Sequence, residues 1–338
     1  MKAYVLHGVN DLRYDDIKIP ECPEGWAIIK VKAAGICSSD IARVFTKGTY
    51  HFPTIPGHEF AGIVESVGSE SDSALLGKHV GIFPLIPCRE CPQCAEKQYE
   101  MCANYDYVGS RRDGGFAEYV AVPVWNLLLL DESIPFTSAA MLEPLSVALH
   151  AMKLSGVKDG DIVGIIGTGM IGIGAAQWSK KLGAKEVTII GRNETKRTLI
   201  EKCGLKYEVC NNKDSIGQFD VVLEAVGTPS AIELAVYATR PGGTCVLMGN
   251  PSGDITFSQN TYWRILRKQL KIVGTWNSAY DGTNQSDWTD AVEALAKNEV
   301  NVAPLISHCF PQEELIQGLE LMRDHKEPYC KVMTTWNE

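Results

Sequence analysis

Two different patterns of hydrophobic and polar positions divide the chain. Its first 147 residues carry short apolar, strand-like runs that glycine and proline interrupt at short intervals. The clearest of these runs are 27–33, 59–67 and 79–84. Short strands separated by turn-forming residues predict a mainly-β domain in this part of the chain.

From residue 148 to about 280, short apolar strands alternate with helices. The predicted strands are 161–166, 186–190, 219–225, 243–248 and 270–275, and the predicted helices are 169–182 and 194–203. This alternation indicates an α/β domain with a doubly wound parallel sheet, covered on both faces. Mixed structure returns afterwards, with helices expected at 288–297 and 313–324. We therefore predict that the α/β domain, 148–280, is inserted between two pieces of the β domain, 1–147 and 281–338.

Composition fits a globular protein of two domains. The chain has 338 residues, of which 45% are hydrophobic and 22% are charged. Its net charge of -9 argues against nucleic acid or an anionic membrane as a partner. We find neither an apolar stretch long enough to span a bilayer nor a leader pattern at the N-terminus, so we expect a cytoplasmic protein.

A glycine-rich turn follows the first strand of the α/β domain and opens a helix. It has the pattern GxGxxG and consists of Gly167, Thr168, Gly169, Met170, Ile171 and Gly172. Between a strand and a helix, this pattern predicts a dinucleotide site, because the backbone can approach a pyrophosphate there and the helix N-terminus supplies free N–H groups. The alternative is a glycine-rich turn without a ligand.

The end of the second predicted strand bears on which dinucleotide binds. An acidic residue at this end would bind the ribose 2′-hydroxyl of NAD. The strand ends instead at Ile190 and continues into Gly191 and Arg192, with Arg197 close behind. Arginine can pair with a 2′-phosphate, so we expect NADP to be favoured over NAD. The alternative is that Arg192 is a solvated charge beside an NAD ribose.

Four of the eleven cysteines lie within fifteen residues. They have the spacing C-x2-C-x2-C-x7-C and are Cys88, Cys91, Cys94 and Cys102. Four thiolates on one short loop can close a tetrahedral zinc site that leaves no open position. The spacing therefore predicts a structural zinc site.

A second set of metal-binding residue types is dispersed along the chain. It comprises Cys37 with Ser39 and Asp40, then Gly57 with His58 and Glu59, and later Glu143 followed by a proline. Each piece alone is a weak signal, but together they offer sulfur, nitrogen and oxygen ligands and leave room for water or substrate.

These motifs, in this order, resemble the zinc-dependent medium-chain alcohol and polyol dehydrogenases over essentially the whole chain. The resemblance implies a Rossmann domain inserted in a GroES-like catalytic domain, two zinc ions per chain, and hydride transfer between an alcohol and NAD(P). It also implies site roles: Cys37, His58, Glu59 and Glu143 for the catalytic zinc, with Glu143 binding directly or through water, Asp40 as hydrogen-bond partner of His58, and Ser39 as proton relay. An intact ligand set disfavours a non-enzymatic protein on this fold.

The loop 109–116 resembles that of galactitol-1-phosphate dehydrogenases in particular. Sorbitol-type members carry histidine and tyrosine where this chain has Ala42 and Arg43. We therefore expect a small-molecule substrate, a polyol or polyol phosphate, with Arg43, Arg111 and Arg112 as candidate phosphate ligands. The alternatives are that these arginines are structural or surface charges, and that the substrate is an unphosphorylated polyol or a secondary alcohol. A homodimer or homotetramer is expected.

Overall fold

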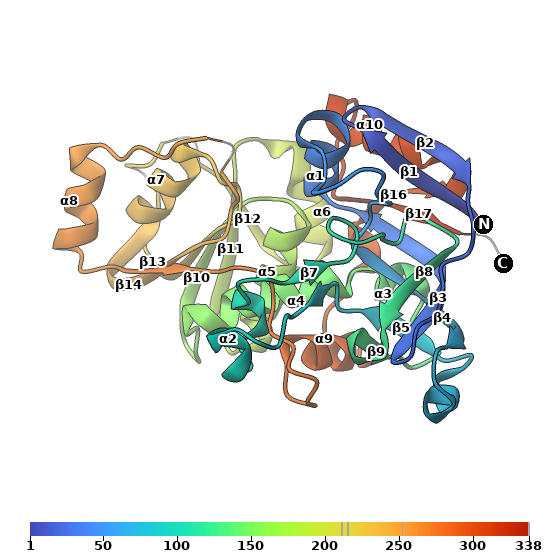
Figure 1. Ribbon diagram of the computed structural model, residues 1–338. Helices are drawn as coiled ribbons and strands as arrows, with labels where there is room; N and C mark the ends of the chain where they lie inside the picture. The colour runs from blue at the N-terminus through green and yellow to red at the C-terminus, as the bar shows by residue number, and fades with distance from the viewer. Residues whose placement is uncertain (211, 215, 252, 337–338) are drawn as a thin grey trace. The chain divides into compact units, whose positions relative to one another are not determined.

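The computed structural model describes residues 1–336, except 211, 215 and 252 (Figure 1). The chain forms two compact units. The first consists of Met1–Glu143, Ala279–Asn298 and Ile306–Glu338, and the second of Pro144–Ser278 and Glu299–Leu305. This division falls within a few residues of the predicted borders, and it adds the short segment Glu299–Leu305 to the second unit.

The second unit is built on a parallel six-stranded sheet with the order β12-β11-β10-β13-β14-β15. Its strands are β10 (Ile162–Ile166), β11 (Glu186–Gly191), β12 (Lys206–Val209), β13 (Phe219–Glu224), β14 (Thr239–Leu247) and β15 (Lys271–Gly274). Its helices are α5 (Met170–Lys181), α6 (Arg197–Lys202), α7 (Pro229–Ala238) and α8 (Gln259–Arg267). The predicted doubly wound parallel sheet is confirmed, and each predicted strand lies within a few residues of its observed place.

Helices α7 and α8 of this unit were not predicted from the pattern. Thr228 accepts a hydrogen bond from the N–H of Ala231 and caps α7, which has Pro229 in its first turn. Ser258 caps α8 in the same way, accepting from the N–H of Thr261. A hydroxyl residue before a helix is a start signal that the sequence already contained.

The first unit is built on a seven-stranded sheet with the order β16-β17-β3-β4-β5-β9, in which β8 also pairs with β3. Its strands are β3 (Trp26–Ile36), β4 (Glu59–Val67), β5 (His79–Ile82), β8 (Tyr119–Pro123), β9 (Leu127–Leu129), β16 (Ile306–Pro311) and β17 (Lys331–Thr335). Two smaller pairs are β1 (Lys2–Gly8) with β2 (Asp11–Asp16), and β6 (Leu85–Ile86) with β7 (Asp106–Tyr107). The unit is therefore mainly β, as predicted.

Short helices connect the strands of this unit, and α3, α9 and α10 pack against its sheet. They are α1 (Ser38–Ala42), α2 (Pro92–Ala95), α3 (Phe136–Ala139), α9 (Asp287–Ala296) and α10 (Leu315–Asp324). A further helix, α4 (Leu142–Ser155), contains the border between the two units near its start and was not predicted. No helix in the described part of the chain is long and apolar enough to cross a membrane.

Strand register brings three strand ends together in the first unit. β3 pairs antiparallel with β17, so that Val332 lies opposite Ile36. β3 also pairs antiparallel with β4, so that Glu59 lies opposite Gly35. The last residues of β3 and the first residues of β4 and β17 therefore lie side by side at the same end of the sheet, although they come from distant parts of the sequence.

The glycine-rich turn after β10 can be tested with a matched pair of substitutions. A Cβ at Gly172 would overlap the carbonyl oxygen of Gly167, whereas the nearest atoms to a Cβ at Gly174 lie at 3.5 Å or more. We expect Gly172→Ala to destabilise the second unit. Gly174→Ala should instead stabilise it by up to about 1 kcal/mol, because alanine favours a helix interior. Urea unfolding measures both, and equal effects of the two changes would contradict the tight turn.

Candidate metal and nucleotide sites

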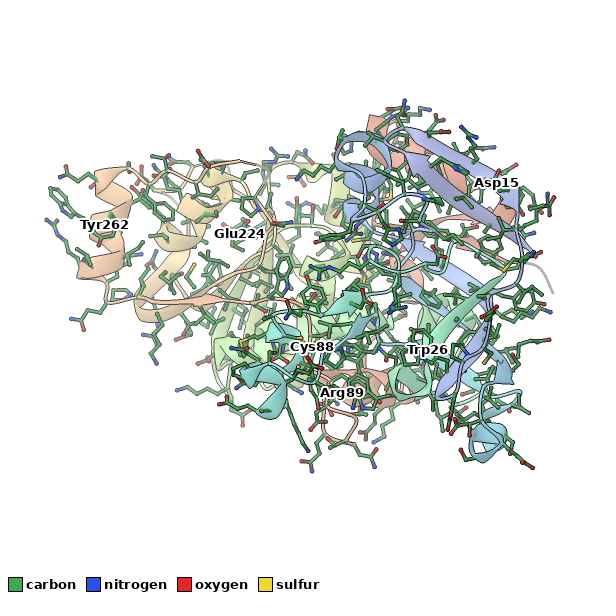
Figure 2. The ribbon with its side chains drawn as sticks, in the orientation of Figure 1. Asp15, Trp26, Cys88, Arg89, Glu224 and Tyr262 are labelled. Carbon is green, nitrogen blue, oxygen red and sulfur yellow. The ribbon has the colours of Figure 1, made fainter. Side chains whose placement is uncertain are left out.

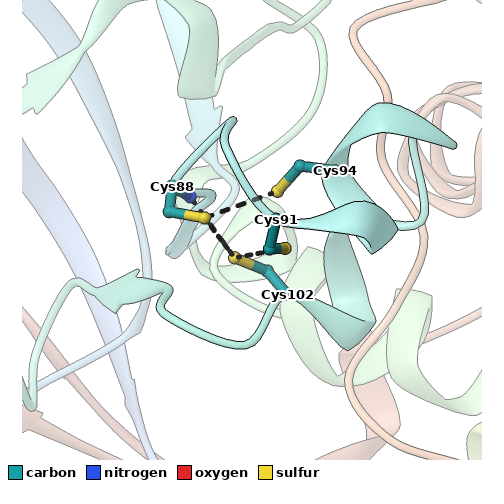
Figure 3. Close-up of side chains that lie close together, drawn as sticks. All are labelled: Cys88, Cys91, Cys94 and Cys102. Atoms are coloured by element: carbon teal, nitrogen blue, oxygen red, sulfur yellow. Dashed lines mark hydrogen bonds between the residues drawn. The ribbon is translucent and has the colours of Figure 1, made fainter.

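The four cysteines of residues 88–102, here called the cysteine lobe, converge on one point (Figure 3). The Sγ atoms of Cys88 and Cys102 are 3.4 Å apart, and the pairs Cys88–Cys94 and Cys91–Cys102 are both 3.9 Å apart. A zinc–sulfur bond of about 2.3 Å gives a tetrahedron with sulfur–sulfur edges of about 3.8 Å. The donor set therefore fits a tetrahedral zinc ion.

Backbone N–H groups of the cysteine lobe stabilise the ionised form of one of its thiols. Hydrogen bonds from the N–H groups of Ala103 and Cys94 lower the pKa of Cys91 to about 6. Burial, by contrast, raises the pKa of Cys94 to about 12. A metal ion would hold such a buried thiol in its ionised form, because a coordinating thiol is deprotonated outright.

A second cluster lies where the ends of β3, β4 and β17 meet. Ligand atoms of Cys37, His58 and Glu59 lie within 4.8 Å of one another. Cys37 directly follows β3, and His58 and Glu59 stand at the start of β4. The structure thus brings together three of the four ligands that the resemblance implied for a catalytic zinc ion, and one thiolate, one imidazole and one carboxylate suit that metal.

Asp40 fixes two members of this cluster. Its side chain is fully buried, and Oδ2 accepts a hydrogen bond of 2.9 Å from the N–H of Cys37, at the start of α1. Oδ1 lies 3.4 Å from Nδ1 of His58. Burial opposes ionisation of Asp40, but the positive charges of His58 and Arg43 hold its pKa below the ordinary value. Because Nδ1 faces Asp40, the other ring nitrogen of His58 is the one available to a metal.

Arg43 belongs to this supporting layer. One guanidinium nitrogen donates to Oγ of Ser39 at 2.7 Å and to Oδ1 of Asp40 at 3.2 Å. The side chain is 22% exposed, so most of it is withdrawn from solvent. Arg43 therefore already donates hydrogen bonds to Ser39 and Asp40, close to Cys37. An arginine that binds phosphate would instead keep these donor groups free.

Lys331 was not singled out from the sequence, yet it lies directly beside the second cluster. Its Nζ forms a buried ion pair with Oε2 of Glu59 and donates to the carbonyl oxygen of Ile36 at 3.2 Å. Burial would lower the pKa of Lys331, but the carboxylate of Glu59 raises it above the ordinary value. Lys331 is 272 residues from Glu59, so no local motif could have revealed the pair.

Glu143 and Tyr107 form a further pair near the cluster. In the described part of the chain, Glu143 does not join the group within 4.8 Å; its Oε1 accepts a hydrogen bond of 3.2 Å from the Tyr107 hydroxyl. The Tyr107 ring lies 5.8 Å from that of His58. Burial raises the pKa of Glu143 to about 7, although the positive charge of His58 opposes this shift. Tyr107 was missed because a lone tyrosine carries no spacing signal.

The loop 109–116 is fastened to the segment that precedes His58. The N–H groups of Gly114 and Gly115 donate to the carbonyls of Ile55 and Gly57 at 2.7 and 2.8 Å. Gly57 has a φ of 96°, and a Cβ there would meet the ring of Phe116 at 2.6 Å. The loop glycines therefore set the place of His58 by close backbone packing.

The two arginines of this loop have different surroundings. Arg112 donates to Asp106 at 2.5 Å and lies over the Trp26 ring. Arg111 lies over two tyrosine rings, 4.4 Å from the centroid of Tyr50 and 4.3 Å from that of Tyr105. It donates to the carbonyl of Tyr105, and its Nε is buried with no hydrogen-bond partner in the described chain. Arg112 is therefore paired, whereas among the described residues Arg111 has no carboxylate partner.

The glycine-rich turn of the second unit borders a cleft of about 590 Å³. Gly167 has a φ of 128°, which favours glycine, and Gly169 lies at the N-terminus of α5 without a side-chain cap. Of the six residues of the turn, Gly167 and Thr168 line the cleft, while Met170, Ile171 and Gly172 form the first turn of α5. Free N–H groups at a helix start beside such a cleft can bind phosphate.

Gly191 and Arg192 line the same cleft at the end of β11. Arg197, by contrast, already has ion-pair partners: it pairs with Glu194 and Glu201, and it lies over the ring of Tyr207. Any side chain at Gly191 would overlap the Tyr207 hydroxyl. Of the two predicted arginines, therefore, only Arg192 faces the nucleotide cleft without an ion-pair partner among the described residues.

Family models match both units of the chain. The model described as "Alcohol dehydrogenase GroES-like domain" matches residues 23–132, and the one described as "Zinc-binding dehydrogenase" matches residues 171–297. Together they cover more than half of the chain.

Curated relatives match almost the entire length. Galactitol 1-phosphate 5-dehydrogenase of Escherichia coli K12 is 34% identical over 94% of this chain and 95% of its own. L-threonine 3-dehydrogenase of Bacillus subtilis is 32% identical over 91% of both chains.

Solved structures agree with these matches. The crystal structure of galactitol-1-phosphate dehydrogenase from Escherichia coli has a TM-score of 0.91 and 33% identity, covering 99% of this chain and 100% of its own. A zinc-binding dehydrogenase from Sinorhizobium meliloti bound to NADP has a TM-score of 0.89 and 27% identity, covering 99% and 98%. An alcohol dehydrogenase from E. coli CFT073 complexed with NADH has a TM-score of 0.89 and 26% identity, covering 99% of both chains.

The cysteine lobe yields a test by metal analysis. Cys102→Ser removes one of four sulfur ligands, so we expect it to lose the metal of the lobe and to lower the free energy of unfolding. Cys309→Ser is the matched control, because Cys309 is exposed and lies outside both clusters. Elemental analysis and thermal unfolding of the two variants check this, and unchanged metal content in Cys102→Ser would contradict a structural site.

Proposed function

Because the chain belongs to the zinc-dependent medium-chain dehydrogenase family and is thus an oxidoreductase, we propose that it transfers a hydride between a polyol phosphate and NADP. The main observation in support is that ligand atoms of Cys37, His58 and Glu59 lie close together, next to the buried carboxylate of Asp40. The substrate class follows from the relative that acts on galactitol 1-phosphate, and from one arginine of the first unit that has no carboxylate partner among the described residues.

We propose that Cys37, His58 and Glu59 hold a catalytic zinc ion, with Glu143 binding directly or through water, and that the cysteine lobe holds a structural one. When bound, the catalytic ion acts as a Lewis acid that lowers the pKa of the substrate hydroxyl. Asp40 keeps the His58 ring turned for binding. Ser39 accepts a hydrogen bond from Arg43, so its own hydroxyl proton is free to be exchanged with the substrate.

Preference for NADP is supported by the residues at the end of β11. No acidic side chain stands there to bind a ribose 2′-hydroxyl, whereas Arg192 lines the cleft beside Gly191. A charge-assisted hydrogen bond contributes about 1.5–3 kcal/mol, or roughly ten- to a hundredfold in affinity. Arg192 is thus the side chain that distinguishes the two cofactors.

Arg192→Ala should therefore raise KM for NADP by about tenfold or more and change KM for NAD little. The matched control is Lys206→Ala, which removes a positive charge that is paired with Glu186 at the opposite end of these strands. Steady-state kinetics with both cofactors measures the effect. A parent enzyme that prefers NAD, or equal losses with both cofactors, would contradict the proposal.

Phosphate recognition is assigned to Arg111 in preference to Arg43. The Arg111 guanidinium lies 4.4 Å and 4.3 Å from the ring centroids of Tyr50 and Tyr105, and it has no carboxylate partner among the described residues. The Tyr105 ring lies 6.0 Å from that of Tyr107, which in turn neighbours His58. A substrate bound at the metal could therefore extend along these rings and place a terminal phosphate at Arg111.

Arg111→Ala should reduce kcat/KM for a hexitol or pentitol phosphate by about ten- to a hundredfold, and reduce it little for the free polyol. Arg112→Ala, which changes a neighbouring arginine that already pairs with Asp106, is the control and should leave the ratio of the two substrates unchanged. Kinetics on a panel of polyols and their phosphates measures this ratio.

Two results on the same panel would change the proposal. If both substrates suffer equally in Arg111→Ala, the arginine orders the loop and does not read phosphate. If the parent enzyme already prefers the free polyol or a secondary alcohol, the alternative of an unphosphorylated substrate replaces the phosphate.

We also propose that the chain forms a homodimer, or a homotetramer built from such dimers. Support comes from β15, which lies at the edge of the six-stranded sheet, and from the adjoining α8 (Figure 2). Large apolar side chains between 41% and 57% exposed lie on these two elements and just after β15: Tyr262, Trp263, Leu266, Ile272 and Trp276. An edge strand with such neighbours is suited to pair with the same strand of a second copy.

A further inference from the structure

The ion pair between Glu59 and Lys331 places a fixed positive charge beside the second cluster. Both side chains are almost completely buried, at 3% and 5% exposed. Lys331 is the first residue of β17, and the pairing of that strand with β3 fixes its position against Ile36. The charge is therefore held by the sheet itself.

Gly35 provides the space that this pair occupies. A Cβ at this position would lie 2.5 Å from Oε2 of Glu59 and 2.7 Å from Cε of Lys331. Glu59 lies directly opposite Gly35 in the pairing of β3 with β4. The missing side chain on β3 thus lets the two charged groups meet over the strand.

The Glu59 carboxylate lies beside both the second cluster and Lys331. One of its oxygens lies within 4.8 Å of ligand atoms of Cys37 and His58, and Oε2 is bound by Lys331. A thiolate and the carboxylates of Glu59 and Glu143 would together offset more than the two positive charges of a zinc ion. A cation on Glu59 reduces that excess of negative charge and weakens the carboxylate as a ligand.

We propose that Lys331 is a positioning residue that restrains Glu59 from binding the catalytic metal fully, so that one coordination position stays open and the metal keeps its positive charge. This inference rests on the metal centre proposed above. An open position is what separates a catalytic zinc site from a structural one. Lys331 acts through Glu59 and does not itself touch the substrate.

The proposal predicts a change that a merely structural lysine would not give. In Lys331→Met, Glu59 is released to the metal and a repelling positive charge is lost, and both effects tighten metal binding. Metal release should slow by about tenfold or more while kcat falls, because the open position is filled. Lys331→Arg keeps the charge and should stay close to the parent in both measurements.

Release of metal from the holoenzyme into a chromogenic zinc chelator is the readout, independent of turnover. His58→Ala identifies which release phase belongs to the second cluster and which to the cysteine lobe. If Lys331→Met folds poorly by circular dichroism, Lys331→Gln serves with the same expectation. In a Glu59→Gln background, Lys331→Met should change metal release no further, because its effect passes through that carboxylate.

Faster or unchanged metal release in Lys331→Met would overturn the proposal, since the lysine would then only support the fold. Failure of the metal centre itself would give a different result. In that case His58→Ala would remove no release phase from the parent profile.

Discussion

The buried carboxylate of Asp40 is the interaction on which the second cluster depends. It accepts the N–H of Cys37 at one oxygen and faces His58 and Arg43 with the other. A fully buried carboxylate without such partners would be strongly unfavourable, so its charge requires all three groups to stay in place. Asp40 thereby fixes the positions of three groups around the ligand atoms: the start of α1, the imidazole ring of His58 and the guanidinium of Arg43.

Much of the architecture was predictable because it depends on patterns within short segments of the sequence. Apolar strands alternating with helices predicted the parallel sheet, and the glycine-rich turn and the four-cysteine spacing each lie within one short segment. α7 and α8 were missed although Thr228 and Ser258 mark their starts. α8 is also amphipathic, so a helical period was present there in the sequence as well.

The site residues were predictable only where the residue type itself indicates a metal ligand. Cys37 and His58 are conspicuous, whereas Lys331 and Tyr107 gain their meaning from strand register and ring packing. The arginines show the same limit: the sequence suggested Arg43, Arg111 and Arg112 as cations near the substrate. The fold separates them into one bound to Asp40, one paired with Asp106 and one lying over two tyrosine rings.

The pairing of β3 with β17 joins segments about 295 residues apart, as the contact between Lys331 and Ile36 measures. A ribosome adding 5–20 residues per second needs roughly 15–60 s to pass from Ile36 to Lys331. The second unit is complete before then and can fold on the nascent chain. Cys37 and His58 are exposed early, but Lys331, the counter-ion of Glu59, is synthesised only after the whole of the second unit. A chain that terminates before Lys331 would therefore carry metal ligands without their finished surroundings.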